Sequence, residues 1–261
     1  MASTINTNQA SINAQRWLAG TESSLQTSMA RLSSGLRVNS AKDDAAGMAI
    51  ASKLEATMRG TNVGIRNAND GVSMAAMADG ALASITTNLQ RMRELAVQKA
   101  SGTTDSDGKA AIDVELKLLG LENERVIVNT KFNSVALLSG ANTTSIELGD
   151  GSPAVAFATT AFGGYAAKDA ASATVANVDA DLIGWNLMRA EYGATQNQFQ
   201  AIAGNLRSNS ESLSTARGRI IDADYAQETA NLTRSQVLAQ AGTAMVAQAN
   251  QGPNGVLALL R

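Results

Sequence analysis

The most chemically capable side chains in this 261-residue chain are closely spaced carboxylates. Asp43 adjoins Asp44, and Asp222 lies two residues before Asp224. Paired carboxylates could act as a general acid and base or hold a metal ion. Each pair also precedes a segment with a helical pattern, where a carboxylate accepts hydrogen bonds from free N–H groups and is favoured by the helix dipole. We therefore interpret both pairs as helix caps.

Two further charged clusters also have simple structural interpretations. Asp105, Asp107 and Gly108 follow part of the spacing of a calcium loop, but Val114 stands where the last ligand, a Glu, would be, which favours a polar turn. Arg91 and Arg93, beside Glu94, could bind a phosphate, but arginines on a helix surface are usually solvated or paired. We expect no metal site in either cluster.

The chain contains no histidine and no cysteine. It therefore has no imidazole base, no thiol nucleophile and no disulfide framework. An enzyme built from this chain would have to use carboxylates, Lys or Tyr in a pocket that the pattern does not indicate. We expect a protein that is not an enzyme and that uses no cofactor.

The charge balance and the apolar runs exclude two classes of partner. The 21 Lys and Arg residues nearly cancel the 23 Asp and Glu residues, so there is no electrostatic reason to bind nucleic acid or an anionic membrane. No apolar run approaches the roughly 18 residues of a membrane span. The first residues also lack the apolar region of a cleaved signal peptide, so export would require another signal.

The composition favours long helices. Hydrophobic residues make up 44% of the chain but aromatic residues only 3%, and there are two prolines. Heptad and helical repeats cover both ends of the chain, while residues 129–180 are rich in Val, Thr and Gly, which is typical of short strands and loops. We predict a mainly α fold, with long antiparallel helices in a coiled-coil bundle and a small β-hairpin or loop region in the middle of the chain.

The strongest repeat runs from Met188 to Ile220, where apolar positions alternate spacings of four and three with Thr195 and Asn209 as polar positions in the seam. A matching stripe lies before residue 100. From these two stripes we predict the bundle core to be Leu82, Ile85, Leu89, Met92, Tyr192, Phe199, Ile202, Leu206, Leu213 and Ile220.

The terminal segments carry apolar residues in excess of what one neighbouring helix can cover. After Asp222 the apolar residues wrap more than one face, which indicates burial against other chains. The predicted self-assembly residues are Ile5, Ile12, Leu18, Leu25, Leu32, Leu232, Leu238, Ala241, Met245 and Val246. We divide the chain into terminal helices (1–40 and 221–261), a helical bundle (41–141 and 179–220) and a short variable surface region (142–178).

Several segments match a known family residue by residue. The chain resembles bacterial flagellin, in a short form without large outer domains, at 31–37 (RLSSGLR), 40–47 (SAKDDAAG), 66–71 (RNANDG), 89–96 (LQRMRELA), 222–234 (DADYAQETANLTR), 240–245 (QAGTAM) and 247–250 (AQAN). One departure is Ser134, where the family often has Gly after Phe132 and Asn133, so the type of this turn is left open.

The resemblance implies a structural subunit of the bacterial flagellar filament, a homo-polymer used for swimming motility, with the terminal helices forming its inner core. It implies type III export, a secreted, extracellular location in the flagellum, and as partners an export chaperone, the filament cap and hook-filament junction proteins. It also implies recognition by the innate immune receptor TLR5 through Arg91, Leu95, Gln98 and Glu115. A hook-filament junction protein of the same superfamily and a secreted helical effector remain as alternatives.

Overall fold

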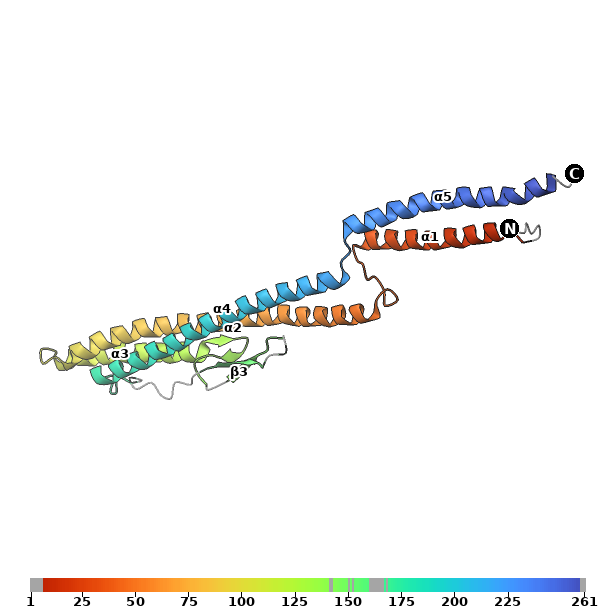
Figure 1. Ribbon diagram of the computed structural model, residues 1–261. Coiled ribbons are helices and arrows are strands. Elements are labelled where there is room, and N and C mark those ends of the chain that lie inside the picture. The colour runs from red at the N-terminus through yellow and green to blue at the C-terminus, as the bar shows by residue number, and fades with distance from the viewer. Residues whose placement is uncertain are drawn as a thin grey trace. The chain divides into compact units, whose positions relative to one another are not determined.

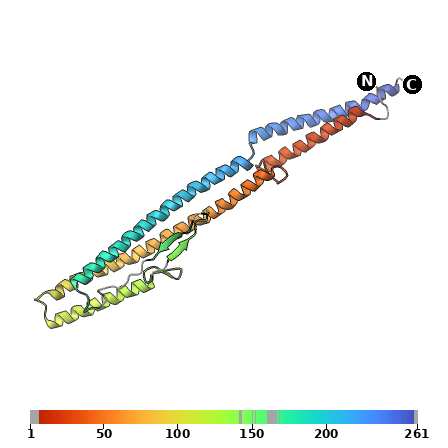
Figure 2. The same cartoon turned by 60° about the horizontal axis from the view of Figure 1, so that its bottom comes forward.

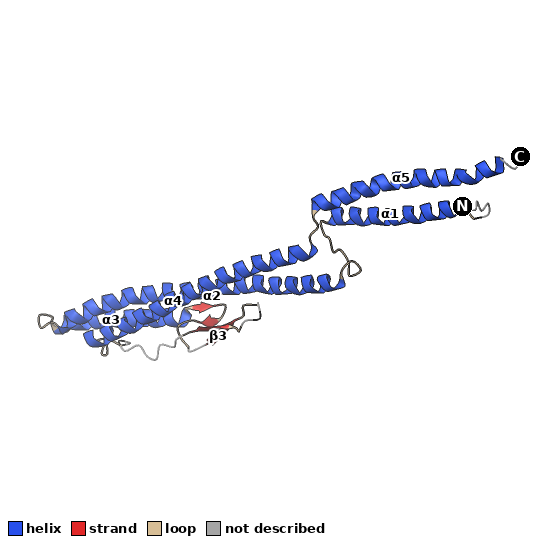
Figure 3. Ribbon diagram, in the orientation of Figure 1, coloured by secondary structure: helices blue, strands red, loops and turns tan. Residues whose placement is uncertain are grey.

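The computed structural model describes residues 7–140, 143–149, 151, 153–159, 167 and 169–258, with the backbone alone over 252–258. In order along the chain, its elements are α1 (Gln9–Ser34), α2 (Ala45–Ala100), α3 (Ser106–Asn129), β1 (Lys131–Phe132), β2 (Val135–Ala136), β3 (Thr143–Ile146), β4 (Val155–Ala158), α4 (Val175–Ile221) and α5 (Tyr225–Ala258) (Figure 1). The strands lie in the middle of the chain and helices occupy both ends (Figure 3). The predicted fold class is confirmed.

The chain forms two compact units. Residues 1–56 and 213–261 form the first, and residues 57–212 form the second. The helices α2 and α4 each contribute to both units, so neither boundary coincides with a turn or a glycine-rich break in the sequence. None of the helices in the described residues is long and apolar enough to cross a membrane.

Carboxylates cap three of the helices. Asp44 Oδ1 accepts a hydrogen bond from the Gly47 backbone N–H at 2.9 Å at the start of α2, and Asp224 Oδ1 accepts from Ala226 N at 2.9 Å at the start of α5. Asp105 caps α3 in the same way through Gly108 N at 2.8 Å. These contacts satisfy N–H groups that have no partner within the helix. The cap interpretation is confirmed for Asp44 and Asp224.

The other member of each acidic pair has a different role. Asp43 accepts hydrogen bonds from the Ser40 hydroxyl and backbone N–H, both at 2.9 Å, in the turn before α2. These hydrogen bonds, with the side-chain bond first, lower the pKa of Asp43. Asp222 forms an isolated backbone bridge with Leu36, so it joins two chain segments and caps no helix.

The core of the second unit lies between α2, α3 and α4, which run side by side there (Figure 2). Leu82, Ile85, Leu89, Met92, Tyr192, Phe199 and Leu206 are buried there, and Ile202 is half-buried. Leu213 and Ile220, which were predicted for the same core, are half-buried and belong to the first unit. The polar positions expected in the seam do not bridge helices: Thr195 bonds its own helix at Glu191 O, and Asn209 is exposed. The buried amide that links two helices is Asn123 of α3, whose Oδ1 accepts from Asn88 Nδ2 at 2.8 Å.

The middle of the chain contributes to this core, which corrects the expectation that 142–178 is only a surface region. Phe157 of β4 is fully buried, with its ring 6.0 Å from that of Tyr192 and 6.4 Å from that of Phe199. The hairpin of β3 and β4 pairs Ile146 with Val155, and Ile146 is also buried. The calls that fall on 141–142, 150, 152, 160–166 and 168 lie outside the described residues.

Candidate assembly interface

The helices α1 and α5 form an antiparallel pair in the first unit. At one end Asn8 Nδ2 donates to Ala249 O at 2.8 Å, and at the other Arg31 Nη1 lies 3.8 Å from Glu228 Oε2. The close approach between these ends is made at Gly242, where an added Cβ would meet Leu18 Cδ1 at 3.2 Å. The sequence therefore pairs the two helices through polar contacts and a glycine.

The described side chains that become buried on α1 and α5 are polar. They are Ser11, Ser28, Glu228 and Ser235, and no apolar side chain described on either helix is fully buried. The small apolar core of this unit consists of Val38, Ala51 and Ile221. None of these residues lies on α1 or α5. Since apolar burial is the main favourable contribution to helix packing, this pair gains only part of the available stabilisation from contacts within one chain.

The large apolar side chains of the pair face solvent instead. Trp17 is 79% exposed and Met245 61% exposed. Among the predicted self-assembly residues, Ile12, Leu238, Ala241 and Met245 are exposed, Leu18, Leu25, Leu32, Leu232 and Val246 are half-buried, and Ile5 lies outside the described residues. Trp17 and Val237 are also exposed but are not among the predicted residues. Trp17 lies one position before the heptad of Leu18, Leu25 and Leu32.

An apolar groove runs between the two helices where these side chains meet. Trp17 and Leu18 of α1 and Leu238, Ala241 and Met245 of α5 line it, and its volume is about 540 Å³. Soluble monomers rarely expose contiguous apolar surface of this kind unless a partner covers it. The groove is thus suited to receiving an apolar helix face.

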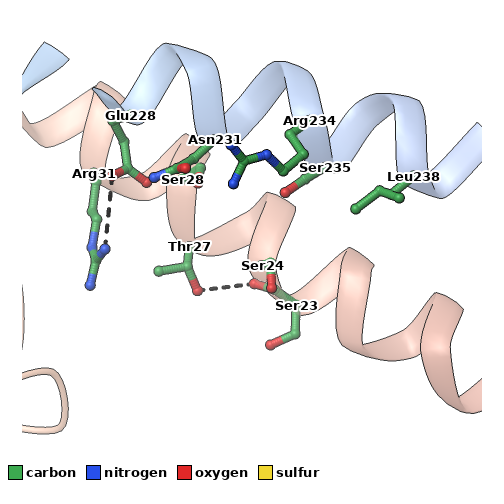
Figure 4. Close-up of a pocket in the computed structure, with 10 residues that line it drawn as sticks. All are labelled: Ser23, Ser24, Thr27, Ser28, Arg31, Glu228, Asn231, Arg234, Ser235 and Leu238. Carbon is green, nitrogen blue, oxygen red and sulfur yellow. Dashed lines mark hydrogen bonds and ion pairs between the residues drawn. The ribbon is translucent and has the colours of Figure 1, made fainter. Parts of the chain in front are cut away.

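A polar groove continues from Leu238 toward the other end of α1 (Figure 4). Arg31, Glu228, Asn231 and Arg234 line it together with the hydroxyl residues Ser23, Ser24, Thr27, Ser28 and Ser235. The ion pair of Arg31 with Glu228 lies at one end of this groove. Glu228 is 7% exposed, so this pair is formed in a partly desolvated position.

The residues expected to contact TLR5 lie on α2 and α3 of the second unit. Three of them are accessible to solvent and one is buried. Arg91 Nε donates to Glu115 Oε1 at 2.9 Å, and this hydrogen bond, followed by that to Glu94, raises the pKa of Arg91. Both side chains are about half exposed, and Gln98 is exposed. Leu95, however, is only 2% exposed and belongs to the core. Its expected direct contact with a receptor needs correction, because its side chain supports this surface from beneath.

The sequence comparisons fit this arrangement. A family model described as the bacterial flagellin N-terminal helical region matches residues 5–143, and the model of the bacterial flagellin C-terminal helical region matches residues 175–260. The chain is also 39% identical to a flagellin of Halalkalibacterium halodurans, over 98% of this chain and 99% of that one. The chain belongs to the bacterial flagellin family.

A second relative agrees with this assignment. The flagellar filament 33 kDa core protein of Treponema phagedenis is 34% identical over 98% of this chain and 99% of its own length. A crystal structure of Bacillus cereus flagellin matches 54% of this chain and 88% of that chain, at 28% identity and a TM-score of 0.49. The relatives' names favour a filament subunit over the junction protein and the secreted effector.

As a flagellin family member, the chain is a structural subunit of the bacterial flagellar filament and a component of the flagellum. A structural role agrees with the caps formed by Asp44 and Asp224, whose carboxylates are engaged with backbone N–H groups. A feature that sequence reasoning missed is a second apolar stripe on α3, formed by Val114, Leu118 and Leu121, each more than half exposed. The sequence shows its spacing of four and three residues. The opposite face of α3 carries the apolar stripe that enters the core, so this second stripe is left exposed.

Proposed function

We propose that the chain polymerises by burying the exposed apolar faces of α1 and α5 against the same helices of neighbouring copies. The observation that carries the proposal is that the fully buried side chains in the described parts of this helix pair are all polar, while Trp17, Leu238 and Met245 remain in water. Burying one such side chain contributes roughly 1.5–3 kcal/mol. A few of them at each contact offset much of the cost of bringing subunits together.

The test adds a charge to the apolar groove. Met245→Asp leaves the monomer intact, because the side chain is 61% exposed there, but places a carboxylate where the polymer has no water to solvate it. We expect this variant to fail to elongate short wild-type filament seeds, as measured by sedimentation and electron microscopy.

Gln240→Glu is the matched control, since it adds the same charge at an exposed position of α5 outside the groove. It should elongate seeds at close to the wild-type rate. Elongation by Met245→Asp at the wild-type rate, with monomer helicity unchanged, would remove α5 from the polymer contact and contradict the proposal.

The same apolar helices need cover before assembly. An export chaperone that binds α5 supplies that cover during type III export, and the filament cap and the hook-filament junction proteins meet these helices at the two ends of the extracellular polymer. What supports this part is family membership together with the exposure of Val237, Leu238 and Met245. Co-purification of the intact chain, but not of one lacking 226–261, with the cognate chaperone tests it.

A second proposed role is recognition by TLR5 in hosts that encounter the monomer. The receptor would contact a surface formed by Arg91, Gln98 and Glu115. Leu95 positions these residues from the core. Support comes from the family resemblance and from the half-exposed ion pair of Arg91 with Glu115, which presents both charges at one surface point.

A further inference from the structure

The helix pair carries few charges. In the sequence of α1 and α5 they are Arg16, Glu22, Arg31, Glu228 and Arg234. Arg31 and Glu228 pair with each other. Within the part of the chain that the structure describes, the remaining three side chains are exposed and form no ion pair, which leaves one carboxylate and two guanidinium groups.

Arg234 is the unpaired cation that lines the polar groove of Figure 4. Around it, Ser23 of α1 and Asn231 of α5 offer a hydroxyl and an amide group that can donate to a carboxylate. Ser24 and Thr27 also line the groove, but their hydroxyls donate to Gly20 O and Ser23 O of their own helix. The groove has a volume of about 430 Å³, and the carboxylate that also lines it, Glu228, is held by Arg31. The groove therefore has the chemistry of a site for a further carboxylate.

Glu22 does not reach this site within its own chain. Leu18 packs at Gly242 and Arg31 reaches Glu228, which places Arg234 level with Leu25 of the antiparallel partner helix. Glu22 lies three residues before that level, or about 5 Å along the axis at the rise of an α-helix. A second copy displaced by about this amount along the axis brings its Glu22 level with Arg234 of the first.

We propose that Glu22 of one copy binds in the polar groove of a second copy and pairs there with Arg234. This inference rests on the proposed polymerisation through α1 and α5. Apolar contacts are non-directional and hold two helices together at several axial offsets. A charge pair that is desolvated in the contact selects one offset, because each other offset leaves a charge buried without its partner.

The test uses charge reversal in the full chain. Glu22→Arg and Arg234→Glu should each slow seeded self-elongation at low salt by about tenfold or more, because each places two like charges in the contact. The double variant Glu22→Arg with Arg234→Glu restores an opposite pair and should self-elongate at within about threefold of the wild-type rate. All three keep monomer helicity, since both side chains are exposed.

Arg16→Glu is the matched control, because Arg16 is exposed on α1 but does not line the polar groove. It should leave the rate nearly unchanged. Single variants that elongate normally, a double variant no better than the singles, or a control as damaging as Arg234→Glu would each overturn the pairing. The proposed function is judged separately: if Met245→Asp stops elongation while Glu22→Arg does not, the polymer contact stands and the pairing is wrong.

Discussion

Gly64 of α2 lies directly against the backbone carbonyl of Leu148, so that no side chain can be placed between them. Gly60, one turn earlier, meets Gly149 in the same way, and Asn67 Nδ2 donates to Glu147 O at 2.8 Å one turn later. Two glycines and an amide on one face of α2 thus hold the segment that follows β3. The backbone approach explains why α2 keeps residues of low helical propensity at these positions.

Gly64→Ala should therefore destabilise the second unit, by about 2 kcal/mol, because a methyl group forces the backbone at Leu148 away from α2. Gly80→Ala is the control on the same helix, since open space surrounds that position. It should stabilise the protein by up to about 1 kcal/mol through helix propensity. Urea unfolding of both variants measures the difference, and equal effects of the two substitutions would contradict the packing argument.

The turn between β1 and β2 offers a substitution that should stabilise the protein. Asn133 and Ser134 have φ values of 44° and 70°, which is the pattern of a type I′ hairpin turn and answers the question left open by Ser134. A non-glycine residue other than Asn or Asp is strained at such a φ. Ser134→Gly should raise the free energy of unfolding by about 0.5–1 kcal/mol, whereas Ser134→Ala should give no gain. A destabilised Ser134→Gly variant would show that the hydroxyl matters more than the strain.

The sequence predicted the helices well because their repeats are local. The repeat of α4 even extends further than was recognised: Val178 and Trp185 continue the spacing of four and three ahead of Met188, and both are fully buried. Asp181 interrupts that stripe, which hid the extension. Its buried carboxylate accepts a hydrogen bond from Ala167 N at 2.8 Å, a contact between distant residues that no local pattern indicates.

The assembly residues were harder to predict. Heptads identify which face of α1 is apolar, and they predict Ile12 and Leu18 as assembly residues. They do not show which apolar residues remain exposed once α5 is in place, so they do not identify Trp17. Leu95 was wrongly expected on the receptor surface, because a match to a family motif does not show whether a residue is buried in this chain.

The surface formed by Arg91 and Glu115 can be tested with the monomer. Arg91→Ala with Glu115→Ala should reduce TLR5 activation by at least about tenfold, because truncating a charge at the centre of an interface commonly has an effect of this size. The fold should be unaffected, since the pair is half exposed. Arg125→Ala is the control: it removes an exposed arginine of α3 that pairs with Glu122 and lies outside the expected surface. Equal signalling by the double variant and the wild type would remove the assignment.

The last prediction concerns the middle of the chain, where a surface segment was expected and a core residue was found. Phe157 fills the space between Tyr192 and Phe199, and the Tyr192 hydroxyl donates to Leu137 O at 2.9 Å beside it. Phe157→Ala should cost about 3–5 kcal/mol, because it removes a buried ring and leaves a cavity lined by aromatic side chains.

Ala158→Ser, on the exposed face of the same strand, should change stability by less than about 0.5 kcal/mol. Because α1 and α5 belong to the other compact unit, Phe157→Ala should lower the unfolding temperature of residues 57–212 while leaving seeded elongation intact at low temperature. Calorimetry and seeded growth of the same sample separate the two effects. If Phe157→Ala stops elongation at a temperature where the second unit is still folded, then the middle of the chain takes part in the polymer contact and α1 and α5 do not act alone.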